Sequence, residues 1–307
     1  MGDAGDQGAF IGLGRMGQPM ALNMARKGFE LAVFDTNAGA MQPFTEFNGC
    51  RQATSATDAA QGAPIAITCL PGPNELSAVA LADGGIIDTL PPGSLYMDLS
   101  TITPELTDAL AAKAAARGAG FVDAPIGRLA SHADKGESLF MVGASDADFA
   151  RVKPALEAMG TTIHHCGPPG AGTRTKLINN TLAVVSCTMN AEVMALTQAF
   201  GLDLTTTLAV IHGTSATNGQ LKLNLEKKTL LGDTEPGFAI DLAAKDLALI
   251  LAAAGSATVS MPVAAAARET VSLARAGGYG RKDFSALADF VCEVNGVDKA
   301  RLPKPTD

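Results

Sequence analysis

Tryptophan and basic residues are what this sequence most lacks. It contains no tryptophan, and its 23 Lys and Arg are outnumbered by 31 Asp and Glu, giving a formal net charge of −8 at pH 7. No run of Lys or Arg stands out, whereas a nucleic-acid-binding protein needs a basic face to neutralise phosphates. We therefore expect no nucleic acid partner, and a small anionic substrate would have to be bound by a few local cations.

Cysteine and histidine are also sparse. The five cysteines are scattered with no C-x-x-C pair, and the four histidines lack the spacing of metal ligands. Zinc sites and disulfide frameworks need clustered spacing, so the sequence predicts no metal site. Free thiols are typical of a reducing cytoplasm, which is where we expect this chain to act.

No segment combines the length and apolarity of a membrane span. The most apolar long stretch, residues 182–200, is interrupted by Asn190, Glu192 and Gln198, which favours a buried helix. Residues 1–8 have neither the basic region nor the apolar region of a signal peptide. With 47% hydrophobic and 18% charged residues, the composition is typical of a well-packed globular protein, and we expect no membrane partner.

Short apolar runs alternate with helical patterns up to residue 167, and then the strand signals stop. The expected strands are Ala9–Ile11, Leu31–Phe34, Ile65–Cys69, Leu95–Asp98, Phe121–Asp123, Leu139–Val142 and Thr162–Cys166. Such alternation predicts a largely parallel sheet covered on both faces. After a Gly-Pro-Pro-Gly cluster, helices are expected over residues 173–200, 204–212, 220–230, 239–254, 263–276 and 285–294. The sequence thus predicts an α/β domain (1–167) followed by an all-α domain (168–307).

Gly12, Gly14 and Gly17 form a G-x-G-x-x-G motif directly after the strand Ala9–Ile11. In a dinucleotide-binding unit the first glycine makes the turn from strand to helix, the second lets the backbone approach the pyrophosphate, and the third lets helix and strand pack closely. The pyrophosphate then lies at the positive N-terminus of the helix. The motif alone is common in a chain with 33 glycines, but its place between strand and helix favours a Rossmann-type domain.

Asp35 ends the second expected strand, where a carboxylate accepts hydrogen bonds from the ribose hydroxyls of a dinucleotide. It is followed by Thr36 and Asn37 rather than by an arginine, so it would repel the 2′-phosphate of NADP. The alternative role for Asp35 is a turn or cap residue. We expect NAD to be preferred over NADP.

Lys176, Asn179 and Asn180 lie at positions i, i+3 and i+4 of the helix expected over residues 173–200, so they share one face. A lysine can be the general base for a hydroxyl that is oxidised, and the general acid in the reverse reduction. The same three residues could equally form an ordinary solvated helix face. The motif by itself does not decide between the two.

Several motifs together resemble the β-hydroxyacid dehydrogenases, a family that includes 3-hydroxyisobutyrate dehydrogenase and 6-phosphogluconate dehydrogenase. They are the run from Gly12 to Ala21, the tripeptide Asp123-Ala124-Pro125, the spacing Gly-x-Gly-x-x-x-Lys-x-x-Asn-Asn that ends at Asn180, and the run from Leu242 to Leu247. The resemblance covers nearly the whole chain, in order. It implies a Rossmann-type domain, an all-helical second domain, and a homodimer or homotetramer.

The resemblance also implies a role for each matching residue. Lys176 is the implied catalytic acid/base, and Asn179 and Asn180 are implied to bind the substrate. The implied cofactor-binding residues are Gly12, Gly14, Arg15, Met16, Gly17, Asp35, Leu70, Thr101 and Lys245. Ser100, just after the strand Leu95–Asp98, either bonds the nicotinamide or substrate or caps the next helix, and we assign it to the site.

The chain departs from the family after Asp123-Ala124-Pro125. Most members carry a Ser-Gly-Gly segment there that holds the substrate carboxylate, whereas this chain has Gly127-Arg128-Leu129. A guanidinium offers a planar fork of donors suited to a sulfonate or carboxylate. Gly127 and Arg128 are therefore expected to bind the anionic end of the substrate. The alternative for Arg128 is a surface ion pair.

The segment around Arg128 is similar to the branch typified by 3-sulfolactaldehyde reductase, which forms 2,3-dihydroxypropane-1-sulfonate. We expect this reaction with NADH. One alternative is a carboxylate substrate, such as succinic semialdehyde/4-hydroxybutyrate or 3-hydroxyisobutyrate. Imine reductases share the architecture but usually lack a lysine at the position of Lys176. A non-catalytic NAD-binding protein would not need Lys176, Asn179 and Asn180 on one face.

Overall fold

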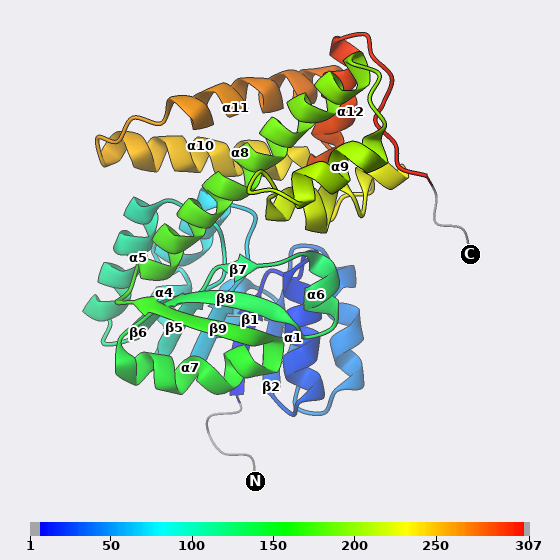
Figure 1. Cartoon of the computed structure of the whole chain (residues 1–307). Coiled ribbons are helices and arrows are strands. Elements are labelled where there is room, and N and C mark those ends of the chain that lie inside the picture. Colours follow the sequence, from blue (N-terminus) through cyan, green and yellow to red (C-terminus); the bar gives the residue numbers. More distant parts are fainter. Residues whose placement is uncertain (1–6, 304–307) are drawn as a thin grey trace. The chain divides into compact units, whose positions relative to one another are not determined.

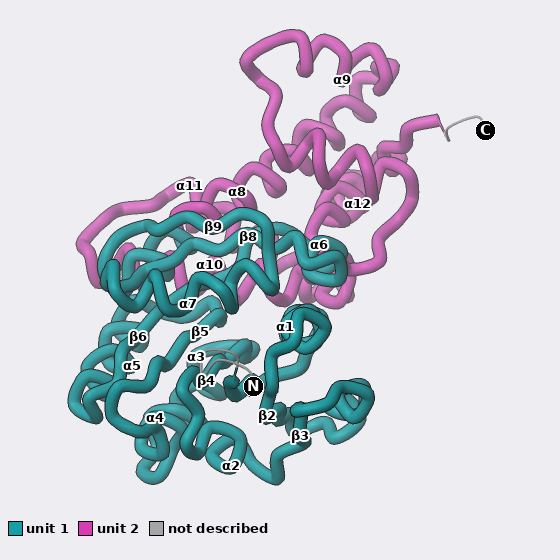
Figure 2. Tube along the Cα trace, turned by 90° about the horizontal axis from the view of Figure 1, so that it is seen from below, with its two compact units in different colours: residues 1–177 teal, residues 178–307 magenta. Residues whose placement is uncertain are grey.

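The computed structural model describes residues 7–303, which divide into two compact units. Unit 1 ends at Leu177 and unit 2 begins at Ile178 (Figure 2). The sequence placed the boundary earlier, after residue 167. The division falls inside helix α8 (Ala171–Ala199) because the start of this helix is hydrogen-bonded to residues of unit 1. The sequence predicts that residues 1–8 are not a signal peptide. Residues 1–6 of this segment lie outside the described residues.

The described part of unit 1 is built on a nine-stranded sheet with the order β3-β2-β1-β4-β5-β6-β8-β7, in which β9 also pairs with β8. The strands β1 to β6 pair in parallel, as the alternation of strand and helix signals predicts. Their order reverses between β1 and β4. The strands are β1 (Gln7–Ile11), β2 (Glu30–Phe34), β3 (Arg51–Gln52), β4 (Ile65–Thr68), β5 (Leu95–Asp98), β6 (Gly120–Asp123), β7 (Ile126–Gly127), β8 (Ser138–Gly143) and β9 (Gly160–Gly167).

Helices cover both faces of this sheet (Figure 1). Successive strand residues point to opposite faces, so Phe10 and Met97 belong to one buried core and Ile11 and Tyr96 to the other. The first core is covered by α1 (Gly17–Arg26), α6 (Ala130–Asp134) and α7 (Asp146–Met159). The second is covered by α2 (Ala56–Ala60), α3 (Pro73–Leu76), α4 (Ile86–Thr89) and α5 (Pro104–Ala116). The expected fold class of this unit is confirmed.

Local capping explains where the longer helices of unit 1 begin. Thr103 accepts a hydrogen bond from the amide of Leu106 and precedes a proline, so α5 starts there. Ser145 accepts one from the amide of Asp148 and starts α7 in the same way. In contrast, Met16 precedes α1 and provides no side-chain cap; the amide of Gln18 is instead bonded to the carbonyl of Gly14, and Pro19 has no N–H.

The regular elements of the described part of unit 2 are helices, as expected, apart from one isolated bridge between Ala239 and Asp283, and one predicted helix is corrected. A single helix over residues 220–230 was predicted, but the chain forms the short turns η3 (Leu221–Leu225) and η4 (Thr229–Leu231), separated by the non-helical backbone of Lys228. The ammonium of Lys228 bonds Asp233 at 2.7 Å, which holds this break. The long helices are α8, α9 (Leu204–His212), α10 (Ile240–Ser256), α11 (Pro262–Ala274) and α12 (Leu287–Val294).

Among residues 7–303, every helix falls short of the length or the apolarity that crossing a lipid bilayer requires. The helix α8 contains most of the apolar stretch for which the sequence predicts a buried helix, and this is corrected for one face: Leu182, Met189 and Leu196 are exposed, whereas Asn190 is buried.

Candidate active site

Four parallel strands of unit 1 end at one edge of the sheet. The register pairs Ile11 with Thr68, Thr68 with Asp98, and Asp98 with Asp123, which are the last residues of β1, β4, β5 and β6. Ligands of open α/β sheets bind outside the carboxyl ends of the strands, where the strand order reverses. The glycine motif, Leu70 and Ser100 follow directly on these ends.

The three motif glycines have three different environments. Gly12 has φ +95°, and a Cβ there would collide with the carbonyl of Cys69. A Cβ at Gly17 would collide with the carbonyl oxygen of Gly12. A Cβ at Gly14 would meet nothing within 4 Å. Gly12 and Gly17 are thus glycines because the chain is tightly packed, whereas the open space at Gly14 lets a ligand approach the backbone.

These features fit a dinucleotide pyrophosphate. The first turn of α1 has no acidic residue and no side-chain cap, so the positive end of the helix dipole favours an anion. Met16 is the residue that precedes α1, and it packs against the core. Arg15 is exposed, 3.4 Å from the carboxylate of Asp134. Binding of a dinucleotide by Arg15 and Met16 stays a prediction.

Asp35 follows β2 and is bound to the same loop. One carboxylate oxygen accepts a hydrogen bond from the amide of Leu13 at 2.6 Å, and the other accepts one from the amide of Asn37 at 2.7 Å. Both proposed roles of Asp35 are therefore compatible. It serves as a turn residue here, and a carboxylate has lone pairs left for ribose hydroxyls.

The loops after β4 and β5 are tied together by Ser100, which is 3% exposed. Its hydroxyl donates to Asp98 at 2.7 Å and accepts from the amide of Leu70 at 3.0 Å. Ser100 is not the cap of the following helix, because Thr103 is. The structure gives Ser100 the task of holding the Leu70 loop, and direct contact with a ligand, like that of Leu70 and Thr101, stays a prediction.

Asp98 is the acceptor at the centre of this network. The hydroxyl of Thr68 also donates to it, at 2.7 Å. Burial, with a smaller contribution from the negative charge of Asp98, raises the pKa of Tyr96 well above its usual value and that of Cys69 to about 12. Cys69 therefore remains a protonated thiol at neutral pH, although it lies beside the glycine motif.

Lys176 lies in the second turn of α8 and is partly buried. Its ammonium donates to the carbonyl oxygen of Ile126, on β7, at 2.7 Å. Two residues earlier, Arg174 forms a bidentate pair with Asp108 at 3.0 and 2.8 Å. The position of Lys176 is therefore set by the sheet of unit 1 and not by an exposed helix face, which favours the functional interpretation of this residue.

Arg128 follows β7 and has a left-handed backbone, with φ +70°. Its guanidinium donates to the carbonyl of Glu137 at 2.7 Å and to the hydroxyls of Thr161 and Thr162 at 3.3 and 2.9 Å. The side chain thus bonds neutral oxygens rather than forming the surface ion pair considered from sequence. Gly127 is buried on β7, and a Cβ there would lie 3.0 Å from the side chain of Leu139.

In unit 2, the predicted residues Asn179, Asn180 and Lys245 are connected through Asp246 by hydrogen bonds and an ion pair. Asn179 donates to the side-chain oxygen of Asn180 at 3.0 Å, and Asn180 donates to Asp246 at 2.6 Å. The ammonium of Lys245 lies 3.1 Å from the other oxygen of Asp246. Asp246 is 2% exposed. It orients the amide of Asn180 and neutralises Lys245.

Sequence reasoning missed Asp123 and Asp246 as functional residues. Both are buried carboxylates, and Asp123 accepts two backbone amides at the start of α8. Burial raises the pKa of Asp123 to about 6, although the amides of Thr173 and Gly170 favour its ionised form. The only signal for Asp123 and Asp246 in the sequence was that each lies in one of the motifs that resemble the family.

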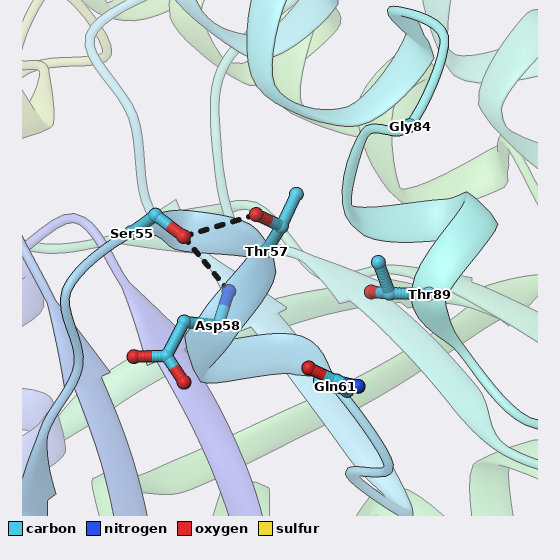
Figure 3. Close-up of a pocket in the computed structure, with 6 residues that line it drawn as sticks. All are labelled: Ser55, Thr57, Asp58, Gln61, Gly84 and Thr89. Carbon is cyan, nitrogen blue, oxygen red and sulfur yellow. Dashed lines mark hydrogen bonds between the residues drawn. The ribbon is translucent and has the colours of Figure 1, made fainter.

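A shallow pocket of about 450 Å³ in unit 1 contains none of the predicted site residues (Figure 3). Its polar groups bond one another, since Ser55 accepts from the amide of Asp58 at 2.9 Å and contacts the hydroxyl of Thr57 at 3.0 Å. Within residues 7–303, no three His, Cys, Asp or Glu side chains are grouped to hold a metal ion.

Comparison with known proteins identifies the family. Residues 7–167 match the NAD binding domain of 6-phosphogluconate dehydrogenase, and residues 170–291 match the NAD-binding domain of NADP-dependent 3-hydroxyisobutyrate dehydrogenase. The chain belongs to the 3-hydroxyisobutyrate dehydrogenase-like family. It is therefore an oxidoreductase that acts on CH–OH groups with a nicotinamide dinucleotide. The alternative of a non-catalytic NAD-binding protein is wrong.

Relatives within this family act on different small hydroxyacids. The chain is 39% identical to the 3-sulfolactaldehyde reductase of Escherichia coli (strain K12), over 92% of this chain and 95% of that protein. It is 36% identical to the NAD-dependent L-serine dehydrogenase of Pseudomonas aeruginosa, over 94% and 98%. Family membership thus establishes the class of reaction, and the residues of the site must distinguish the substrates.

Solved structures agree on the fold. The 3-hydroxyisobutyrate dehydrogenase of Mycobacterium tuberculosis with L-serine has a TM-score of 0.84 at 27% identity, covering 93% of this chain and 98% of that one. An imine reductase from Myxococcus stipitatus has a TM-score of 0.61 at 20% identity, covering 93% and 99%, which shows a shared fold alone.

The glycine environments predict opposite effects of the same substitution. Gly14→Ala should leave the melting temperature unchanged, because a Cβ there has open space, but weaken NADH binding at least tenfold, about 1.4 kcal/mol. Gly17→Ala should lower the melting temperature, because its Cβ collides with backbone. Fluorescence titration with NADH and thermal melts measure the two effects. Equal stability of both variants would contradict this assignment.

Proposed function

We propose that this family member reduces a small anionic aldehyde with NADH, namely 3-sulfolactaldehyde to 2,3-dihydroxypropane-1-sulfonate. The observation that carries the proposal is Arg128. It has φ +70°, a conformation that costs a residue with a side chain about 1–2 kcal/mol. The resemblance implies a glycine there in most relatives, so this chain keeps a guanidinium at a position better suited to glycine. An anion-binding role explains that choice.

The donors of Arg128 support recognition of an oxyanion. A guanidinium has about five N–H groups, and the bonds to Glu137, Thr161 and Thr162 use three of them. The remaining N–H groups of Arg128, together with the hydroxyls of the exposed Thr161 and the half-buried Thr162, are available to a sulfonate. A carboxylate can be bound by the same fork, and 35% identity to a 3-hydroxyisobutyrate dehydrogenase of Pseudomonas aeruginosa supports that second candidate.

Lys176 is the proposed proton donor. A bound NADH supplies the hydride that reduces the aldehyde carbon. The ammonium of Lys176 gives its proton to the carbonyl oxygen, so the aldehyde becomes an alcohol and the lysine becomes a neutral amine. In the reverse direction the amine removes that proton. The 2.7 Å bond to Ile126 supports this role because it holds the ammonium at one place.

The polar chain of unit 2 supports the remaining roles. Asp246 holds Asn180 at 2.6 Å, and Asn180 in turn accepts from Asn179, so both amides have a defined orientation toward a substrate. Lys245, 3.1 Å from Asp246, is the proposed contact of the cofactor. Asp35 is the proposed reason for a preference for NAD.

Assembly and location complete the proposal. We propose a homodimer or homotetramer that forms through unit 2, because exposed large apolar side chains concentrate there and such surfaces mark association sites. On α8 they are Ile178, Leu182, Met189, Val193 and Leu196. All five cysteines carry free thiols, which supports a cytoplasmic location.

The role of Lys176 predicts the phenotype of its alanine variant. Lys176→Ala should lower kcat by roughly 10²–10⁴-fold, because the proton donor is lost, while the Kd for NADH stays within twofold of the parent, about 0.4 kcal/mol. Stopped-flow turnover and NADH titration measure the two. Lys153→Ala, an exposed lysine on α7, is the control and should be fully active. Parental turnover of Lys176→Ala would refute the mechanism.

Arg128 should determine which anion is accepted. Arg128→Gly should remain folded, because glycine adopts φ +70° without strain, but lose roughly 10²-fold in kcat/KM for the sulfonated aldehyde. An uncharged aldehyde of equal length should be unaffected. The substrates tested include the carboxylates 3-hydroxyisobutyrate and L-serine. If the parental enzyme turns these over faster than the sulfonated substrate, a carboxylate replaces the sulfonate in the proposal. Equal losses on charged and uncharged aldehydes would make Arg128 structural.

The cofactor preference follows from Asp35. The parental kcat/KM should be at least tenfold higher with NADH than with NADPH, about 1.4 kcal/mol, because the carboxylate repels a 2′-phosphate. Asp35→Asn should narrow this ratio mainly by improving NADPH. Steady-state kinetics with both cofactors test the point, and an unchanged ratio in Asp35→Asn would mean that Asp35 is a turn residue alone.

A further inference from the structure

The N-terminus of α8 is capped from another element. The residue before this helix is Gly170, which has no side chain, so the helix cannot be capped in the usual way. Instead, Asp123 at the end of β6 supplies both carboxylate oxygens. One accepts from the amide of Gly170 and the other from the amide of Thr173, each at 2.6 Å. These short bonds satisfy amides that would otherwise be buried without acceptors.

Two glycines allow the helix end to come this close to the sheet. A Cβ at Gly143, on β8, would collide with the Asp123 carboxylate and lie 2.8 Å from the amides of Ala171 and Gly172. A Cβ at Gly172 would collide with the carbonyl of Met141. The glycines of the Gly-x-Gly-x-x-x-Lys spacing therefore serve the packing of α8 against β6 and β8.

The same segment holds α8 a second time, one turn further along. Ile126 lies three residues after Asp123, and its carbonyl oxygen accepts from the ammonium of Lys176 at 2.7 Å. Thr173 and Lys176 are themselves three residues apart on the helix. The segment from Asp123 to Ile126, stiffened by Pro125, thus bonds α8 at both ends of a single turn.

We propose that Asp123 is a positioning residue for Lys176. Its carboxylate fixes the first turn of α8, and this in turn keeps the lysine ammonium at the carbonyl of Ile126. The inference rests on the proposed role of Lys176 as proton donor. It adds that the donor is held in place by a carboxylate that touches neither substrate nor cofactor.

The physical reasons lie in burial and charge. Asp123 is 1% exposed, so an amide that loses this acceptor finds no water in its place. The positive end of the long helix α8 favours a negative charge at this point. An asparagine has nearly the same shape, but its NH₂ group would face one of the two amides as a second donor. The first turn would then loosen without a large change in volume.

Asp123→Asn is the principal test. It should lower kcat by roughly 100-fold, the loss expected when a catalytic group is misplaced by about 1 Å, with KM and the Kd for NADH within threefold of the parent. Hydrogen exchange of the amides of residues 171–176 should become faster. These measurements use the full chain with its cofactor and a short-chain sulfonated aldehyde as the probe substrate.

Two further variants separate positioning from general stability. Asp283→Asn is the matched control, because Asp283 is also a buried carboxylate that accepts backbone amides, those of Gly237, Phe238 and Ser285. It should lower stability but leave kcat unchanged. Gly143→Ala displaces the Asp123 carboxylate from the opposite side, so it should reproduce the low kcat even if Asp123→Asn fails to fold.

Each result of these experiments bears on one of three points, namely the positioning role of Asp123, general stability or the proposed function. Faster exchange in Asp123→Asn with parental kcat would overturn the positioning role, as would unchanged exchange in residues 171–176. An equal loss of kcat in Asp283→Asn would reduce the effect to lost stability. If Lys176→Ala retains full turnover, the proposed function itself fails. If Lys176→Ala is inactive while Asp123→Asn and Gly143→Ala are both fully active, the positioning inference alone fails.

Discussion

Loop amides at the carboxyl edge of the unit 1 sheet need acceptors, and aspartates at the strand ends supply them. Asp35 follows β2 and accepts from the amide of Leu13, Asp98 ends β5 and accepts from the amide of Ser100, and Asp123 ends β6 and accepts from the amide of Thr173. The cost of burying unpaired backbone groups makes these bonds obligatory. Because each one ties a loop to a strand, the glycine motif, the Leu70 loop and α8 have defined positions along one edge.

The chemistry of the family rests on that arrangement. The NAD-binding family model spans residues 7–167 of this unit, and the substrates named for the relatives differ. The residue that departs from the family pattern, Arg128, also has a left-handed backbone. Strain of this kind concentrates at ligand-binding positions, where a side chain is needed despite its conformational cost.

Much of the fold could be predicted, because hydrophobic periodicity reports local structure. The expected strands from Ala9–Ile11 to Thr162–Cys166 are all present, and α9 spans the predicted residues 204–212. The strands β3 and β7 were missed because two residues show no periodicity. The predicted helix over residues 220–230 is interrupted at Lys228, whose non-helical backbone and ion pair with Asp233, five residues on, form a local turn that hydrophobic periodicity does not encode.

The sequence by itself predicted the dinucleotide site and placed Lys176, Asn179 and Asn180 on one helix face, because a turn that admits only glycine and an i, i+3, i+4 spacing are local properties. Tertiary structure alone decided which side chains hold them. Asp123 lies far from Thr173 in sequence, and Asp246 far from Asn180, yet each pair is hydrogen-bonded at 2.6 Å. Ser100 is likewise turned inward, to Asp98 and Leu70. Such pairings depend on which chain segments the fold brings together, and no spacing rule encodes them.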